Sequence, residues 1–331
     1  MNVTIVGATG LVGRTMLRVL HERNFPVTTL TLLASPRSAG TTIPFAGQQV
    51  AVLPLSAETI PTNTIALFSA GGAASRQWAP QFAERGNVVI DNSSAWRMDP
   101  TVPLVVPGVN SADAQLHRGI IANPNCSTIQ MVPVLDAIHK RYGLKRVVVS
   151  TYQSPSGAGQ QGVDQLQAEL AGQEPTSRIT PLPLAYNAVF HTIEGVGHGS
   201  EEELKMQRET RRIMHLDDLR MAVTCVRVPV LGGHAESLAI ETVAPIDADV
   251  LRAELAAVQG VVVQDDPARH LYPTPQGSSG SDLVHVGRIR RDDSVEHGVL
   301  LWIVADNLRV GAATNAVRIA ELLLPVPTTP A

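Results

Sequence analysis

The sequence predicts an α/β protein of two domains, an N-terminal domain with a parallel sheet followed by a domain of α+β type. At 331 residues, the chain exceeds the size at which one hydrophobic core usually keeps growing. Short strands alternate with helices in its first part, and longer strands with few helices follow from about residue 145. We expect residues 1–126 and a C-terminal helix at about 307–325 to form the first domain, and residues 127–306 the second.

The composition is that of a globular protein, and it argues against several classes of partner. Hydrophobic residues make up 44% of the chain and charged residues 17%, and the formal net charge of −4 contains no block of like charge. We therefore expect no nucleic-acid binding and no membrane binding, and no apolar run reaches the ~18 residues of a membrane span. Two cysteines without metal-ligand spacing, and a start that does not resemble a signal peptide, predict a cytoplasmic protein with no metal site.

The strand and helix signals of the first domain alternate. β-branched, apolar runs predict strands, and apolar residues at helical spacing predict the helices between them. The expected strands are residues 2–6, 27–35, 65–70 and 87–94, and the expected helices begin at residue 11 and cover residues 75–86. This order is typical of a parallel sheet with helices on both faces.

The second domain shows longer strands at less regular spacing. Five strands are expected at residues 144–153, 220–230, 234–245, 281–291 and 298–307, with helices near 159–171 and 201–214. This pattern favours a mixed or largely antiparallel sheet. A closing amphipathic helix at 309–324 could return to pack on the first domain, and the Pro/Thr-rich tail at 324–331 is expected to be frayed.

A glycine-rich turn separates the first strand from the first helix. Gly7, Gly10 and Gly13 stand at positions i, i+3 and i+6, a variant of the dinucleotide-binding fingerprint. Glycines let backbone N–H groups approach a pyrophosphate, which the helix N-terminus also attracts. The alternative is a tight structural turn, but the position between a buried strand and a helix favours a Rossmann-like nucleotide site.

The end of the second strand predicts which dinucleotide is bound. NAD sites usually place an acid there to hold the ribose 2′-hydroxyl, whereas this chain reads Ala34-Ser35-Pro36-Arg37-Ser38. An arginine flanked by hydroxyl groups suits the 2′-phosphate of NADP. The alternative is that Arg37 is an exposed, solvated charge.

The two cysteines lie in different contexts. Cys126 follows Asn-Pro-Asn at the start of an expected helix, where the helix dipole and free N–H groups favour the thiolate. It could be a small core residue, a structural thiol or a nucleophile, and its position favours the nucleophile. Cys225 lies in an apolar strand and is expected to be an inert core residue.

A possible base and a positively charged group follow Cys225 in the sequence. Arg227 and His234 are seven residues apart, which would place them on opposite faces of a straight strand. Pro229 and the Gly232-Gly233 pair interrupt that strand, so both side chains could reach one site. Taken singly, they could equally be a salt-bridged arginine and a surface histidine.

Eight motifs in order resemble the aspartate-β-semialdehyde dehydrogenase family over nearly the whole chain: GATGLVG, LASPRSAG, IDNSSAWRMDP, ANPNCST, TYQSPSGAG, EEELKMQRET, CVRVPVLGGHAES and VGRIRRD with DNLRVGAA. The resemblance implies NADPH-dependent, reversible reduction of L-4-aspartyl phosphate to L-aspartate 4-semialdehyde through a cysteine thioester. This reaction belongs to lysine, threonine and methionine biosynthesis. The resemblance also implies a homodimer whose partners are the substrate and phosphate.

Roles follow by similarity, residue by residue. Cys126 is expected to be the nucleophile, His234 the general acid/base, and Gln153 the residue that orients substrate and intermediate. The expected substrate-binding residues are Arg97 and Lys205 for phosphate, Arg227 for the α-carboxylate, Glu202 for the ammonium group, and Asn125 and Gln153. Glu203 is expected to be a solvated residue at the helix start.

The cofactor residues are also carried over by similarity. Gly7, Thr9, Gly10, Leu11 and Val12 are expected at the pyrophosphate, Ser35, Arg37 and Ser38 at the 2′-phosphate, Ser156 and Gly157 at the nicotinamide, and Asn307 as a late NADP contact.

Three other interpretations remain open at this point. Another NADP-dependent acyl-phosphate or acyl-CoA reductase of this fold, acting on N-acetyl-γ-glutamyl phosphate or malonyl-CoA, would share the cysteine and cofactor residues. The block RVPVLGGHAE and the lysine helix favour the aspartyl substrate over these. A catalytically dead relative would be expected to lack the nucleophile or the base, and a non-enzymatic NADP sensor would not need the phosphate-binding pair.

Overall fold

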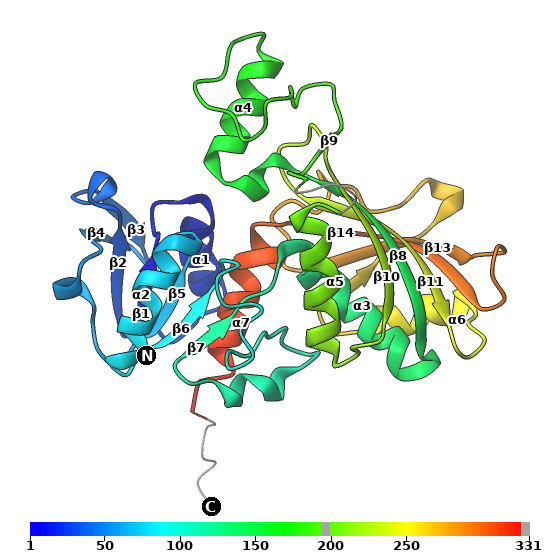
Figure 1. The fold of residues 1–331 in the computed structure, drawn as a ribbon, viewed down its shortest axis with the longest axis horizontal. Coiled ribbons are helices and arrows are strands. Elements are labelled where there is room, and N and C mark those ends of the chain that lie inside the picture. Colours follow the sequence, from blue (N-terminus) through cyan, green and yellow to red (C-terminus); the bar gives the residue numbers. More distant parts are fainter. Residues whose placement is uncertain (194–198, 326–331) are drawn as a thin grey trace, which may run out of the picture. The chain divides into compact units, whose positions relative to one another are not determined.

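A computed structural model describes residues 1–193 and 199–325. They form two compact units, Met1–Pro124 with Ala313–Ala331, and Asn125–Ala312 (Figure 1). Asn125 and Cys126 thus belong to the second unit, whereas the predicted boundary placed them in the first. The expected frayed tail lies almost wholly in residues 326–331, outside the described residues. No helix in the described part of the chain is long and apolar enough to cross a bilayer.

The first unit is built on a seven-stranded sheet in the order β3-β4-β2-β1-β5-β6-β7. All neighbouring strands are parallel except β3 and β4, so the predicted parallel sheet is confirmed with one antiparallel edge. The strands are β1 (Asn2–Val6), β2 (Thr29–Ala34), β3 (Thr42–Phe45), β4 (Gln48–Pro54), β5 (Ile65–Phe68), β6 (Val88–Asp91) and β7 (Ile120–Ala122). Apart from β3, this is the strand order of the doubly wound dinucleotide-binding fold.

Sequence patterns did not reveal the β3–β4 hairpin. Its two-residue turn is formed by Ala46 and Gly47, which both have positive φ angles, 48° and 81°. Such turns usually carry Asn-Gly or Asp-Gly, so the strongest local hairpin signal was absent. Only Ile43 and Val52 of the two strands are buried hydrophobic residues, which also left the alternating pattern weak.

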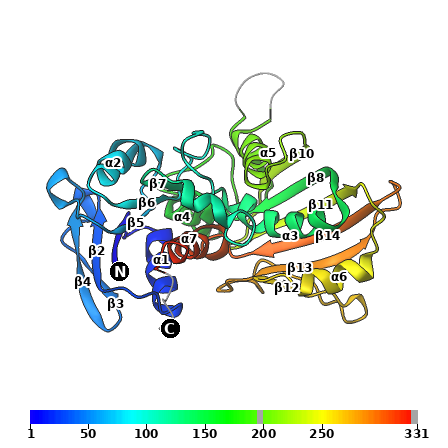
Figure 2. The same ribbon diagram turned by 90° about the horizontal axis from the view of Figure 1, so that it is seen from below.

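Helices cover both faces of this sheet. Figure 2 shows α2 (Gly72–Glu84) on one side and α1 (Leu11–Glu22) and α7 (Asn315–Glu321) on the other. α1 and α7 pack through buried apolar residues such as Leu20 and Val317 into the main core of the unit. The closing helix is therefore part of the first unit. A π-helical turn at Arg309–Thr314 directly precedes it. Three short 3₁₀ helices complete the unit at Pro36–Ser38, Ala57–Thr59 and Ser111–Leu116.

The second unit contains a mixed seven-stranded sheet in the order β12-β13-β14-β11-β8-β10-β9, as the sequence predicted for this domain. Its central strands β14, β11 and β8 are antiparallel, while β8 pairs with β10 in parallel. The strands are β8 (Leu144–Gln153), β9 (Val189–Phe190), β10 (Arg220–Arg227), β11 (His234–Thr242), β12 (Val261–Val263), β13 (Val284–Arg291) and β14 (Gly298–Ala305).

Helices α3 (Cys126–Tyr142), α5 (Glu201–Met214) and α6 (Ala248–Ala256) pack on this sheet, and α4 (Gln160–Leu170) follows a short 3₁₀ turn at Pro155–Ala158. A second 3₁₀ turn lies at Pro267–Arg269. α3 begins where the Asn125 side chain accepts hydrogen bonds from the N–H groups of Ser127 and Thr128, and it ends at Gly143 with a φ of 68°. α6 was not predicted from the sequence.

Candidate active site

Three predicted site residues lie side by side at one end of the second sheet. β8 lies between β10 and β11, and its last residue, Gln153, pairs in register with Arg227 of β10 and with His234 of β11. Cross-strand neighbours point to the same face of a sheet, so the three side chains form one row. Two separate strands therefore bring Arg227 and His234 together, as the broken pattern between them suggested.

Cys126 is the first residue of α3, on the helix that packs over this row. It is partly exposed, whereas Cys225 is fully buried and its thiol pKa is raised, mainly by that burial. A side chain at Gly311 would collide with Cβ of Cys126, so glycine is required behind the cysteine. A thiol at a helix N-terminus gains from the local positive potential, which suits a nucleophile.

Gln153 connects the row to this helix. Its Nε2 group donates to Ser127 Oγ at 3.0 Å, to Thr151 Oγ1 at 3.2 Å and to Glu202 Oε1 at 3.3 Å. The side chain is 1% exposed. These contacts hold the amide in one orientation beside the residue that follows Cys126.

His234 is completely buried and has a defined tautomer. The backbone N–H of Ser154 donates to Nδ1 at 3.1 Å, so a neutral ring carries its proton on Nε2. Nε2 is buried without a hydrogen-bond partner among the described residues, and a Cβ atom at Gly157 would lie 3.2 Å from it. Burial lowers the pKa of His234 to about 4, so the ring is neutral at pH 7 and presents an Nε2–H donor.

Glu202 is the buried acid of the site. Its Oε1 accepts from Asn125 Nδ2 at 2.8 Å, and its Oε2 lies 3.9 Å from Lys205 Nζ. Burial alone would raise its pKa, but nearby positive charge and hydrogen bonds outweigh it and hold the pKa of Glu202 below its usual value. Lys205 forms a closer ion pair with Glu201, at 2.9 Å. The predicted helix face shared by Glu202 and Lys205 is present.

Arg227 has a neighbour that the sequence interpretation missed. His191 Nδ1 lies 3.4 Å from Arg227 Nη2, and because arginine can only donate, the imidazole accepts through Nδ1. Its Nε2 is buried without a partner among the described residues. Burial, helped by the charge of Arg227, lowers the pKa of His191 to about 4. A histidine just after a two-residue strand carries no local signal for this role.

The prediction that Glu203 is a solvated residue is wrong. It is 9% exposed, and its carboxylate accepts from the backbone N–H groups of Ser200 at 2.6 Å and Cys225 at 3.0 Å. The same helix places Glu209, 1% exposed, where Oε2 accepts from the N–H of Asn125 at 2.6 Å. Both acids have a structural use, because they satisfy buried N–H groups beside the site.

Arg97 lies in the first unit and is 8% exposed. Its Nε donates to the carbonyl oxygen of Asn123 at 2.9 Å and its Nη2 to that of Asn92 at 3.0 Å. These bonds fix the guanidinium at the segments that follow β6 and β7.

The glycine turn of the first unit has the geometry of a nucleotide-binding turn. Gly7 has a φ of 85°, and a side chain there would collide with the carbonyl oxygen of Ser69 after β5. α1 starts at Leu11 with Gly10 as its N-cap and no side-chain cap, so its first N–H groups remain available for an anion. Arg37 lies in the 3₁₀ turn after β2 with Ser35 and Ser38. These residues fit a dinucleotide.

Ser156, predicted at the nicotinamide, and Asn307, predicted as a late NADP contact, contact each other in the second unit. Asn307 Nδ2 donates to Ser156 Oγ at 3.0 Å, and Asn307 Oδ1 accepts from the N–H of Gly233 at 3.0 Å. The Asn307 amide therefore holds Gly233, the residue that precedes His234. Asn307 is 2% exposed. Its hydrogen bonds with Ser156 and Gly233 account for this burial without a cofactor contact.

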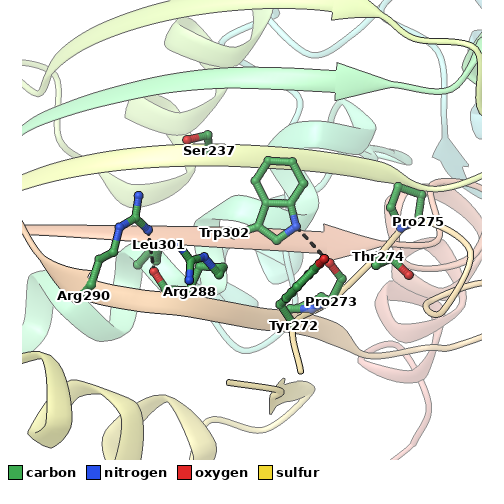
Figure 3. A pocket seen from close by; sticks show the side chains of 9 residues that line it. All are labelled: Ser237, Tyr272, Pro273, Thr274, Pro275, Arg288, Arg290, Leu301 and Trp302. Carbon is green, nitrogen blue, oxygen red and sulfur yellow. Dashed lines mark hydrogen bonds between the residues drawn. The ribbon is translucent and has the colours of Figure 1, made fainter. Parts of the chain in front are cut away.

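A cavity of about 440 Å³ lies elsewhere on the second unit (Figure 3). Its walls include Tyr272, Trp302, Arg288 and Arg290, and Trp302 Nε1 donates to the carbonyl oxygen of Pro273. None of the predicted site residues line it. In the described residues, no cluster of three or more histidine, cysteine or acidic side chains could hold a metal ion.

Two family models match the chain. The semialdehyde dehydrogenase NAD-binding domain matches residues 2–117, and the semialdehyde dehydrogenase dimerisation domain matches residues 135–310. The two matches fall within the two structural units.

Full-length relatives agree with these models. An aspartate-semialdehyde dehydrogenase of Aquifex aeolicus is 52% identical and one of Bacillus subtilis 49%, and the alignments cover 97–98% of this chain and 97% of each relative. A crystal structure of aspartate semialdehyde dehydrogenase II from Vibrio cholerae, complexed with ASA, superimposes with a TM-score of 0.91 at 46% identity and covers 97% of both chains.

Proposed function

The chain belongs to the aspartate-semialdehyde dehydrogenase family, and from this premise we propose how its residues carry out the reaction. Its activity is that of an aspartate-semialdehyde dehydrogenase in the biosynthesis of aspartate-family amino acids. The proposed reaction is the reversible, NADPH-dependent conversion of L-4-aspartyl phosphate into L-aspartate 4-semialdehyde and phosphate. The observation that carries the proposal is the row Arg227–Gln153–His234 beside the helix that starts at Cys126.

Cys126 is the proposed nucleophile. Its thiolate attacks the acyl carbon of aspartyl phosphate, forming a C–S bond and a tetrahedral oxyanion. Collapse of this adduct breaks the C–O bond to phosphate and leaves a thioester on the cysteine. NADPH, when bound, supplies the hydride that reduces this thioester. The Cys126 thiolate is then released as the aldehyde forms, so the enzyme returns to its starting state.

His234 is the proposed acid/base. Because Ser154 holds Nδ1, the ring offers the Nε2–H proton to the oxygen of the reduced adduct and takes it back as the C–S bond breaks. Because residue 157 is a glycine, no side chain crowds Nε2 from that position. A neutral imidazole donor of this kind stabilises an oxyanion without a buried charge of its own.

The charged groups of the substrate each have a proposed partner. The guanidinium of Arg227 suits a bidentate contact with the α-carboxylate, and the anionic carboxylate of Glu202 suits the α-ammonium. Lys205 and Arg97 are proposed for the phosphate, on the strength of the family resemblance. Asn125 and Gln153, which both donate to Glu202, would keep that acid in place.

NADP is proposed over NAD because no acid follows β2. In its place stand Ser35, Arg37 and Ser38, and an arginine fits a 2′-phosphate. Replacement of Arg37 by Ala should raise the KM for NADP⁺ about tenfold or more and change that for NAD⁺ little. Equal effects on both cofactors would contradict this assignment.

A homodimer is proposed, formed through the sheet face opposite α3 and α5. Along each strand, the residues between the buried ones point to this face. Exposed Tyr152 is one of them, and its ring contacts that of Trp302 at a centroid distance of 5.4 Å. The match to a dimerisation domain over residues 135–310 supports a second copy as the occupant of this face.

The decisive assay is phosphate-dependent reduction of NADP⁺ with aspartate semialdehyde as substrate. The purified wild-type protein should be active, and Cys126→Ser should abolish turnover. Cofactor binding without turnover on this aldehyde would leave the fold intact and overturn the proposed reaction.

A further inference from the structure

A carboxyl group without any hydrogen-bond partner lies in the core of the second unit. Glu236 is 0% exposed, and neither of its oxygens has a partner among the described residues. It stands two residues after His234 on β11, so both side chains point to the face of the sheet on which α3 packs. No role proposed so far uses this acid.

No positively charged group among the described residues stabilises the ionised form of Glu236. In register it lies between Thr151 of β8 and Ile303 of β14, which do not titrate. The Cys225 thiol of β10 is a titratable neighbour, and its pKa is raised mainly by burial, so it stays uncharged. No ion pair involves Glu236 in the described part of the chain. Burial raises the pKa of Glu236 well above its usual value, and the side chain of Gln130 opposes this only in part.

Gln130 of α3 links this acid to His234. It is 0% exposed, and its Nε2 donates to the carbonyl oxygen of His234 at 3.3 Å. Its Oε1 is buried and has no hydrogen-bond partner within residues 1–193 and 199–325. Gln130 is four residues after Cys126 and therefore lies on the same side of the helix. Three acceptor oxygens, two on Glu236 and one on Gln130, thus lack a donor among the described residues. A proton on one Glu236 oxygen, donated to Gln130 Oε1, would satisfy two of the three.

We propose that Glu236 carries a proton, donates it in a hydrogen bond to Gln130 Oε1, and through this neutral pair positions His234. The histidine is then held from two sides, by Gln130 at its carbonyl oxygen and by Ser154 at Nδ1. This arrangement keeps Nε2–H on the side of Gly157. The effect of this pair on turnover rests on the acid/base role proposed for His234. The presence of a proton on Glu236 does not depend on that role.

The proton can be tested without any activity measurement. In the infrared spectrum of the full-length protein at pH 7, a band of a protonated carboxylic acid should be present in the wild type and absent from Glu236→Gln. Thermal unfolding gives a second readout. The native acid stays neutral while the unfolded acid ionises, so wild-type stability falls as pH rises through the unfolded pKa, and the Tm advantage of Glu236→Gln should grow from pH 4 to pH 8. A missing acid band, or a constant or shrinking difference in Tm, would overturn the proposal.

The positioning role is tested by kinetics with matched variants. Glu236→Gln keeps a donor for Gln130 and should retain kcat within about twofold. Glu236→Leu and Gln130→Leu each leave a buried polar partner unpaired and should lower kcat about tenfold, with little change in the KM for aspartate semialdehyde. The double variant should be no worse than either single one, because both remove the same link.

The control is Thr210→Val on α5, since Thr210 Oγ1 is also buried and unpartnered. It should not change kcat. Unchanged kcat in Glu236→Leu, or equal losses in Glu236→Gln and Glu236→Leu, would overturn the positioning role. If the wild type itself fails to turn over aspartate semialdehyde, the proposed function fails, while the infrared and Tm measurements still decide whether Glu236 is protonated.

Discussion

The two faces of the second sheet differ in kind although the same strands form both. One face lies under α3 and α5 and carries Gln153 and His234, with Glu236 buried behind them. On the other face, Tyr152 is exposed and contacts Trp302. Because strand residues alternate between faces, one-residue neighbours such as Tyr152 and Gln153 serve opposite sides. Substitutions can therefore be directed at the proposed chemistry or at the proposed dimer contact separately.

The largest effect on turnover is expected at Cys126, on the helix that packs over the face with Gln153 and His234. Cys126→Ser should lower kcat by at least about 10³-fold, because the serine hydroxyl is a much poorer nucleophile than the cysteine thiolate. Cys225→Ala is the matched control, since Cys225 is fully buried in β10, and its kcat should stay near the wild-type value. Mass spectrometry after brief alkylation should find the label on Cys126 and not on Cys225.

His234 comes next. His234→Ala should lower kcat by about 10²- to 10⁴-fold, the range expected for loss of a positioned acid/base. The KM for aspartate semialdehyde should change much less, because the donor acts on the adduct rather than on the bound substrate. A variant that loses affinity and keeps kcat would assign His234 to substrate binding instead.

The same histidine makes a prediction for stability. Its native pKa of about 4 lies below the unfolded value near 6.5, so the unfolded state binds more protons between these pH values. Stability contributed by neutral His234 is complete above pH 6.5 and is lost as pH falls toward 4, by roughly 3 kcal/mol. Denaturant unfolding of the wild type and His234→Asn from pH 7 to pH 4 should show the two free energies converging. Parallel pH profiles would contradict the low pKa.

A smaller effect is expected at His191, which contacts Arg227. His191→Leu removes the acceptor for Arg227 Nη2 and should raise the KM for aspartate semialdehyde about tenfold with kcat nearly unchanged. His191→Gln, which keeps an acceptor, should lie close to the wild type. If both variants behave alike, the contact does not orient the arginine.

The smallest effect on kcat is expected at Tyr152, on the sheet face opposite α3 and α5. Tyr152→Glu places a charge at the proposed dimer contact and should shift the mass measured by light scattering from dimer to monomer. The kcat per chain should remain within about threefold, because the side chain points away from the row that ends at Gln153. Tyr186→Glu, at a tyrosine that is 88% exposed, is the control and should remain dimeric. Loss of activity together with the dimer would show that the two faces are coupled.

Several features could be predicted from local sequence because local geometry determines them. The glycine turn needs positive φ and close backbone approach at Gly7, and the start of α3 needs the cap that Asn125 provides. The parallel first sheet and the mixed second sheet followed from strand spacing and length. The β3–β4 hairpin and α6 did not, because their turn and apolar signals are weak.

The misinterpretation of Glu203 has a physical reason. Glu201, Glu202 and Glu203 are consecutive acids at a helix start, and the sequence does not show which of them faces the sheet. Packing of α5 decided this: Glu201 remains largely exposed, while Glu202 and Glu203 are buried against N–H and amide donors. Helical position alone could not distinguish a solvated acid from one that satisfies the backbone of another strand.

By itself, the sequence determined the fold class, the glycine turn, the cysteine at a helix start and the family to which the chain belongs. Only the tertiary structure decided that Arg227, Gln153 and His234 form one row and that His191 contacts Arg227. It also decided that Glu236 lies on the same face without a partner in the described part of the chain. The reason is that strand register and helix packing join residues that are distant in the chain. The ionisation of a side chain then follows from the neighbours that packing provides, and no local pattern of residues encodes them.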